Sequence, residues 1–143
     1  MSDAARRILL AILILGIAGI SVELWLLAHT GDLYQLIPLL LAGIGVVAAI
    51  LVALRPSLST IRIFQAVMVL FLLSGVVGMV LHFQVNMEFQ LEMDPALSGM
   101  ALFRKSILAK TPPALAPGAM IQLGLIGLAY TFRHPALGAR RTT

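Results

Sequence analysis

The chain alternates between long apolar runs and short polar breaks. Four runs of roughly 20 residues carry almost no charge: residues 8–28, 36–54, 63–81 and 114–132. A helix of that length crosses about 30 Å of hydrocarbon. The runs also lack the strict alternation of a membrane barrel strand. A backbone in lipid must satisfy its own hydrogen bonds, so each run is predicted to be a transmembrane helix.

The runs predict an all-α membrane protein, an antiparallel bundle of four transmembrane helices forming one integral membrane domain over residues 1–143. Composition agrees, because 60% of the residues are hydrophobic and only 11% are charged, about half the charge of a soluble domain. The first run follows Arg6 and Arg7, as in a signal peptide. It is longer than a usual signal-peptide core and precedes no clear cleavage site, so we expect it to be retained as the first span.

Basic residues lie at the ends of the predicted spans. With the N-terminus inside, the inner side holds Arg6, Arg7, Arg55, Arg62, Arg133, Arg140 and Arg141, and the outer side holds Arg104, Lys105 and Lys110. The positive-inside rule therefore predicts cytoplasmic termini, a bacterial inner membrane, and an outer loop over residues 82–113. Because the basic residues form no patch, the net charge of +4 does not indicate nucleic-acid binding.

Small residues recur along one side of each span. They are Gly16 and Gly19; Ala42, Gly45, Ala49 and Ala53; Ser74, Gly75 and Gly78; and Gly124 and Gly127. Helices in lipid associate largely through close packing of such residues. We expect the contacts to form within one bundle, with a seam between copies in a homo-oligomer as the alternative.

The outer loop contains an unbroken alternation of apolar and polar residues over residues 83–94. On an extended strand, one face would carry Phe83, Val85, Met87, Phe89, Leu91 and Met93, and the other Glu88, Glu92 and Asp94. We therefore expect an extracytoplasmic strand. The pair Asp94 and Pro95 is typical of a helix start and predicts a short amphipathic helix over residues 95–110.

A lone strand has unpaired edges and needs a cover. It could fold back onto the bundle or the short helix, lie against lipid or stay partly disordered, or pair with a strand of another subunit. The last arrangement makes the loop a partner-binding surface, with the six apolar residues, Glu88 and Glu92 as contacts.

Glu23 is the one carboxylate within a predicted span. A charge there is costly and should be paired, hydrated or protonated. Gln122 is predicted at a similar depth, and His82 lies at the outer end of the third span. The three side chains are candidates for an intramembrane polar cluster. Such a cluster could fix helix register, carry protons or cations, or dock another subunit.

Motifs for catalysis are absent from the sequence. There is no phosphate-binding loop, nucleophile elbow or zinc-binding HExxH pattern, so we do not expect an enzyme. The absence of cysteine excludes disulfides and thiolate metal sites in this chain. His29, His82 and His134 all fall at span ends without a haem-attachment motif, so no cofactor or metal site is predicted.

These observations favour a small accessory or structural subunit of an inner-membrane complex, or a self-assembling oligomer, with the lipid bilayer and other membrane subunits as partners. The alternative is a small oligomeric transporter or channel using Glu23. The four-span layout and Glu23, between Val22 and Leu24, resemble the small multidrug-resistance exporters. That resemblance implies an essential glutamate in the first helix. Those exporters have short loops, whereas a loop of about 30 residues joins the third and last spans here.

Overall fold

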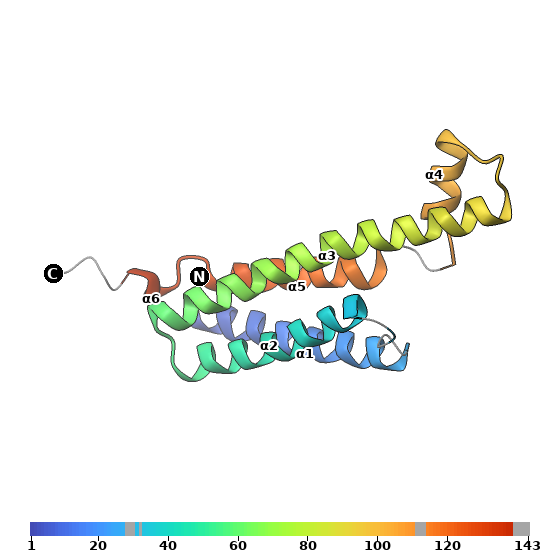
Figure 1. Ribbon diagram of the computed structural model, residues 1–143. Coiled ribbons are helices and arrows are strands. Elements are labelled where there is room, and N and C mark those ends of the chain that lie inside the picture. The colour runs from blue at the N-terminus through green and yellow to red at the C-terminus, as the bar shows by residue number, and fades with distance from the viewer. Residues whose placement is uncertain (28–30, 32, 111–113, 139–143) are drawn as a thin grey trace.

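The computed structural model describes residues 1–27, 31, 33–110 and 114–138, and its regular elements are all helices over this part of the chain (Figure 1). The elements are α1 (Asp3–Leu26), α2 (Leu33–Leu54), α3 (Leu58–Met93), α4 (Gly99–Ile107), α5 (Leu115–Thr131) and α6 (Pro135–Gly138). His29, Arg140 and Arg141 lie outside the described residues.

Three of these helices, α1, α2 and α3, are long and apolar enough to cross a membrane. The fourth predicted span corresponds to α5, an apolar helix of 17 residues. At 1.5 Å per residue α5 is about 25 Å long, slightly shorter than the hydrocarbon core of a bilayer. The structure thus supports a helical membrane protein, whereas a fourth crossing stays a prediction.

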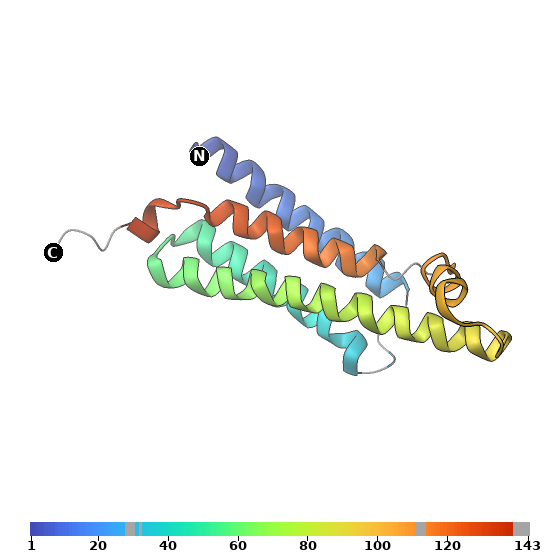
Figure 2. The same cartoon turned by 90° about the horizontal axis from the view of Figure 1, so that it is seen from above.

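Helices α1, α2, α3 and α5 form a bundle in which α1 and α3 each pack against both α2 and α5 (Figures 1 and 2). The largest fully buried side chains in its core are Phe64, Phe71, Leu13, Ile17, Ile61, Met68 and Val52. Large apolar side chains also cover much of the outside: Leu15 of α1 and Leu40 of α2 are 72% and 65% exposed. A water-soluble domain rarely exposes so much contiguous apolar surface.

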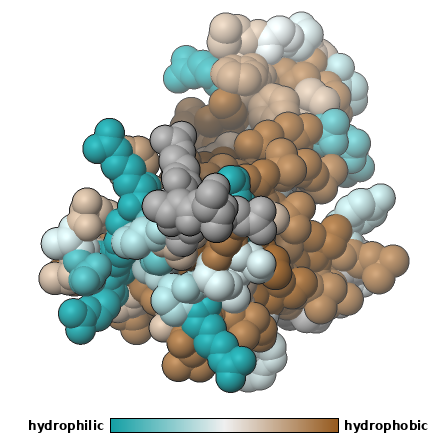
Figure 3. All heavy atoms as spheres, turned by 90° about the vertical axis from the view of Figure 1, so that its left-hand side faces the viewer, coloured by the Kyte–Doolittle hydropathy of each residue, from teal (hydrophilic) through white to brown (hydrophobic). Residues whose placement is uncertain are grey.

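Figure 3 shows how hydrophilic and hydrophobic groups are distributed, seen from the end that carries the termini. Hydrophilic side chains gather at one side of that end, while hydrophobic atoms cover a flank of the bundle. Hydrophilic groups near one end and an apolar flank are compatible with insertion in a bilayer.

The predicted strand over residues 83–94 is wrong, because α3 continues without a break to Met93. A period of two also contains sets spaced by four residues, and residues four apart share one side of a helix. Phe83, Met87 and Leu91 therefore form one apolar stripe of α3, and the other three apolar residues form a second. Neither Gly nor Pro lies between residues 79 and 94, and the segment is rich in Gln, Glu, Met and Leu, which favour helix.

The predicted helix over residues 95–110 also needs correction, since α4 begins only at Gly99. Asp94 ends α3 instead of starting α4: its backbone N–H donates to the carbonyl of Gln90. Its carboxylate also accepts a hydrogen bond from the backbone of Ala96 at 3.2 Å, an interaction that favours a turn. Ser98 then precedes α4 as its N-cap residue.

Close backbone contact joins α3 to α5, and small residues permit it. A Cβ atom added to Gly75 would lie 2.5 Å from the backbone oxygen of Pro117, and one added to Gly124 would lie 2.7 Å from that of Met68. The prediction that these residues pack within one bundle is confirmed for both. Gly19 of α1 differs, because nothing lies within 4 Å of its added Cβ.

Arg6 joins the beginning of α1 to the end of α5. Its guanidinium group donates to the backbone oxygens of Tyr130 at 2.9 Å, Phe132 at 3.4 Å and Arg133 at 2.9 Å. The side chain is buried, and its Nε atom has no hydrogen-bond partner among the described residues. Carbonyls at the C-terminal end of a helix carry partial negative charge, which compensates the buried cation. Both terminal regions therefore lie at one end of the bundle.

Close packing of α3 on α5 predicts that a glycine-to-alanine substitution destabilises the protein inside this contact and stabilises it outside. Gly75→Ala should lower the free energy of unfolding by about 1–3 kcal/mol, because the two backbones must separate. The control Gly19→Ala adds its methyl group in open space and should raise that free energy by about 0.5–1 kcal/mol through helix propensity. Unfolding of both variants in detergent, followed by circular dichroism, measures these values. Equal effects would contradict the packing argument.

The Arg6 contact predicts that charge alone cannot replace the planar guanidinium group. Arg6→Lys should cost about 1–3 kcal/mol of unfolding free energy, because an ammonium group cannot reach all three carbonyls at once. Arg7→Lys is the matched control, since Arg7 is exposed on the same turn. The same unfolding experiment checks both, and an unchanged Arg6→Lys variant would refute the role of the guanidinium group.

Candidate functional site

The structure does not bring the predicted intramembrane polar cluster together. Arg6 lies beside Arg133, and Gly16 lies against Leu123, so residues of α1 and α5 whose numbers sum to about 139 share a level. By this register Gln122 is level with Ile17, about 9 Å along the bundle from Glu23. Both polar side chains are exposed on the outside of the bundle. Among the described residues, neither takes part in a hydrogen bond or ion pair.

The two histidines within the described residues lie at opposite ends of the bundle. His82 is half-buried beside a cavity between α1, α2, α3 and α5. His134 follows α5 at the end that carries Arg6 and accepts a hydrogen bond from the backbone of Ala136 through Nδ1. Burial lowers the pKa of His134, and the charge of Arg6 lowers it further. In the described part of the chain, no group of three His, Asp or Glu side chains is arranged to hold a metal ion.

The predicted outer loop folds as two helices, the end of α3 and α4, which we call the α3–α4 hairpin (residues 83–107). The Asn86 side-chain amide donates to the backbone oxygen of Ser106 at 3.1 Å. The rings of Phe83 and Phe103 lie 5.7 Å apart. Ser106 is fully buried, and its hydroxyl group donates to the carbonyl of Leu102 at 2.9 Å. Helix α4 thus packs against this side of α3, where Phe83, Met87 and Leu91 are half-buried.

The second apolar set of α3 has no such cover. Val85, Phe89 and Met93 are 62%, 57% and 71% exposed. They are spaced by four residues and therefore follow one another along one side of the helix. We call these three residues the outer stripe. Glu88 and Glu92, also exposed, form a parallel acidic row on the same helix.

The outer stripe extends beyond the ends of α1 and α2. Val85 lines the same cavity as Leu24, near the end of α1, and Tyr34, near the beginning of α2. At 1.5 Å per residue, Phe89 and Met93 lie about 6 and 12 Å farther along α3. The hairpin accordingly projects past the other long helices (Figures 1 and 2). Phe89 and Met93 are therefore exposed beyond the ends of α1 and α2.

The eight residues proposed from sequence as partner contacts thus separate into three groups. Phe83, Met87 and Leu91 lie on the α4 side of the helix, and the outer stripe and the acidic row remain accessible. An alternation of apolar and polar residues cannot distinguish these groups, because on a strand all six apolar residues share one face. Spacing by four, combined with the lack of helix-ending residues, was the signal for two stripes.

Comparisons with known proteins give no family or template for this site. The chain matches no protein-family model and no curated protein. The structure likewise matches no solved structure.

The hairpin contact generates a prediction about local stability. Asn86→Ala removes the donor to Ser106 and leaves a buried carbonyl without that partner, so α4 should open about tenfold more often. Hydrogen–deuterium exchange of the α4 amides measures the opening. Gln84→Ala, at an exposed position two residues earlier, should leave the exchange unchanged. Equal exchange in both variants would show that Asn86 does not hold the hairpin.

Proposed function

We propose that this protein is a membrane-anchored assembly subunit that binds another membrane subunit through the outer stripe. The exposure of Val85, Phe89 and Met93 carries the proposal. Large apolar side chains beyond the lipid-facing part of a protein lose about 25 cal/mol of stabilisation for each Å² left in water. A partner surface that covers them recovers this free energy.

The size of the stripe restricts the kind of partner. Three side chains bury far less than the roughly 1,000 Å² that a stable interface between soluble proteins needs. A partner in the same membrane avoids this limit, because insertion raises its effective concentration and its own helices can contact the side of the bundle. The acidic row beside the stripe favours a partner with basic residues at the edge of its apolar surface.

The geometry of the hairpin suits such docking. The stripe lies on α3 itself, which runs from the bundle into the hairpin as one helix. Its spacing of four residues is the spacing by which two helices interdigitate. With the termini in the cytoplasm, as the distribution of Lys and Arg favours, the partner contact would lie on the outer side of a bacterial inner membrane.

The alternative function, transport through Glu23, would require more than one copy of the chain. Glu23 lies on the outside of the single bundle and would reach an enclosed path only if a second copy covered that face. A charged side chain facing lipid is costly, which gives one physical reason for such an association. The outer stripe has no role in this alternative.

The test compares two equal changes of charge on the hairpin. The chain and its complexes are extracted from native membranes in mild detergent, and their native mass is measured. Wild type should migrate as a complex larger than the 15.3 kDa chain. Phe89→Lys should reduce the complexed fraction about tenfold or more, because it places a charge in an apolar contact.

Gln84→Lys is the control, because it adds the same charge to α3 outside the outer stripe. It should leave the complex intact. A mass that is a multiple of the single chain would identify the partner as a second copy. A wild-type chain that is monomeric in the membrane extract, or a Phe89→Lys variant that retains the complex, would refute the proposal.

A further inference from the structure

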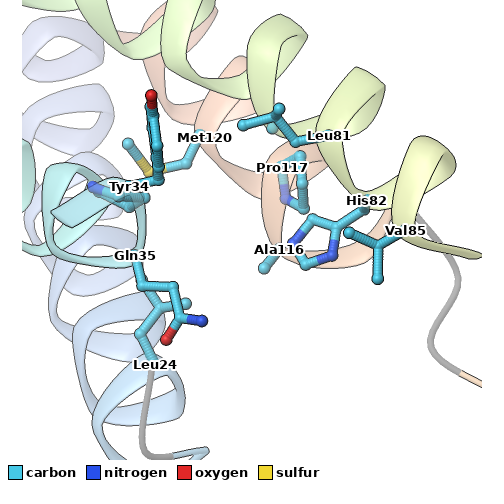
Figure 4. Close-up of a pocket in the computed structure, with 11 residues that line it drawn as sticks. Leu24, Tyr34, Gln35, Leu81, His82, Val85, Ala116, Pro117 and Met120 are labelled. Atoms are coloured by element: carbon cyan, nitrogen blue, oxygen red, sulfur yellow. The ribbon is translucent and has the colours of Figure 1, made fainter. Parts of the chain in front are cut away.

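A cavity of about 250 Å³ lies at the end of the bundle nearest the hairpin (Figure 4). Its walls come from the end of α1, the beginning of α2, the middle of α3 and the beginning of α5. Most of the lining is apolar, as at Leu24, Leu81 and Met120, and three polar residues contribute to it: Tyr34, Gln35 and His82. It is distinct from the outer stripe except at Val85, which lines the cavity and begins the stripe.

Two prolines line this cavity. Pro38 lies inside α2, where it cannot donate the helical hydrogen bond to the carbonyl of Tyr34. Pro117 lies in the first turn of α5, and its ring would be only 3.2 Å from a Cβ atom at Gly78. The ring of Pro117 thus packs against α3 at Gly78, and Pro38 lines the cavity from α2.

The chemistry of the walls selects a hydrocarbon ligand. An apolar cavity of about 150 Å³ can bind benzene, so one of about 250 Å³ has room for a longer stretch of hydrocarbon. Apolar walls give water few hydrogen-bond partners. For a protein inserted in a bilayer, the most concentrated molecules able to fill such a space are acyl chains.

The polar side chains suit the other end of such a ligand. Figure 4 shows Gln35 and His82 on different elements, α2 and α3, bordering the same space. Gln35 accepts a hydrogen bond from the backbone of Gly31, and His82 also has an interaction within the protein. An amide can both donate and accept hydrogen bonds, and an imidazole has two polar nitrogens, so these side chains have the chemistry to bind a polar head. Exposed Tyr34 and Trp25 lie at the same end of the bundle, and such aromatic residues mark the level where headgroups meet acyl chains.

We propose that this cavity binds one acyl chain, with the polar head of the same amphiphile held at Gln35 and His82. The acyl chain could belong to a bilayer phospholipid or to a free fatty acid, since the cavity recognises the chemistry that the two share. This inference rests on membrane insertion and does not depend on the docking of a partner to the outer stripe.

The protein contains a built-in reporter for the experiment. Trp25 is the only tryptophan, and it directly follows Leu24 of the cavity wall. Delipidated full-length protein in detergent micelles is titrated with dibrominated stearate, whose bromine atoms quench indole fluorescence on contact. A parallel titration uses phosphatidylglycerol with brominated chains, and the tighter of the two ligands identifies the source.

Wild type should show saturable quenching with one site, reversed by unlabelled oleate. Ala116→Phe fills the cavity from α5 and should weaken binding about tenfold or more, because the methylene groups it displaces lose their burial. Ala129→Phe makes the same change at an exposed position of the same helix and should bind as wild type does.

Leu81→Phe fills the cavity from α3 at a partly exposed position and decides the outcome if Ala116→Phe does not fold. Quenching that rises linearly with the micellar fraction of brominated lipid, and is equal in all four proteins, would overturn the inference. Loss of the partner complex in the Phe89→Lys experiment would leave this result unchanged, so the two proposals can fail separately.

Discussion

The hydrogen-bonding requirement of a backbone in lipid governs this structure. A peptide group in hydrocarbon has no water to bond, so a crossing segment must be helical. A second effect carries α3 beyond the bilayer thickness: a helix that is already formed adds residues cheaply until something ends it. Nothing does so before Asp94, and α3 reaches 36 residues. The hairpin is therefore a continuation of a membrane helix and not a separate loop.

Close packing turns these helices into one bundle. Lipid offers little hydrophobic reason for helices to associate, so contact must come from good packing and from polar groups with partners. Gly75 and Gly124 let the backbones of α3 and α5 meet. Gln65 of α3 adds a hydrogen bond to Thr131 of α5 at 3.0 Å. Arg6 then ties α1 to the C-terminal end of α5, where helix carbonyls compensate its buried charge.

Function, as we propose it, belongs to the end of the molecule away from Arg6. That end carries the uncovered outer stripe and the cavity between α1, α2, α3 and α5. Both border α3, and Val85 belongs to each. A partner bound to the outer stripe would therefore lie beside any acyl chain in the cavity. Glu23 is exposed on the outside of α1, away from the core residues of that helix, so it takes no part in the packing of the single bundle.

The sequence alone determined the class of protein and the positions of its apolar helices, because length and hydropathy are local properties that a bilayer reads directly. Only the tertiary structure decided the state of residues 83–94, since an alternating pattern is compatible with a strand and with a helix carrying two apolar stripes. The unbroken helix α3, with α4 packed against it at Phe83 and Asn86, resolved that choice. The sequence likewise could not place Glu23 relative to Gln122 along the bundle. Their relative positions depend on the register between α1 and α5, which is set by contacts between distant parts of the chain, such as that of Arg6 with Arg133.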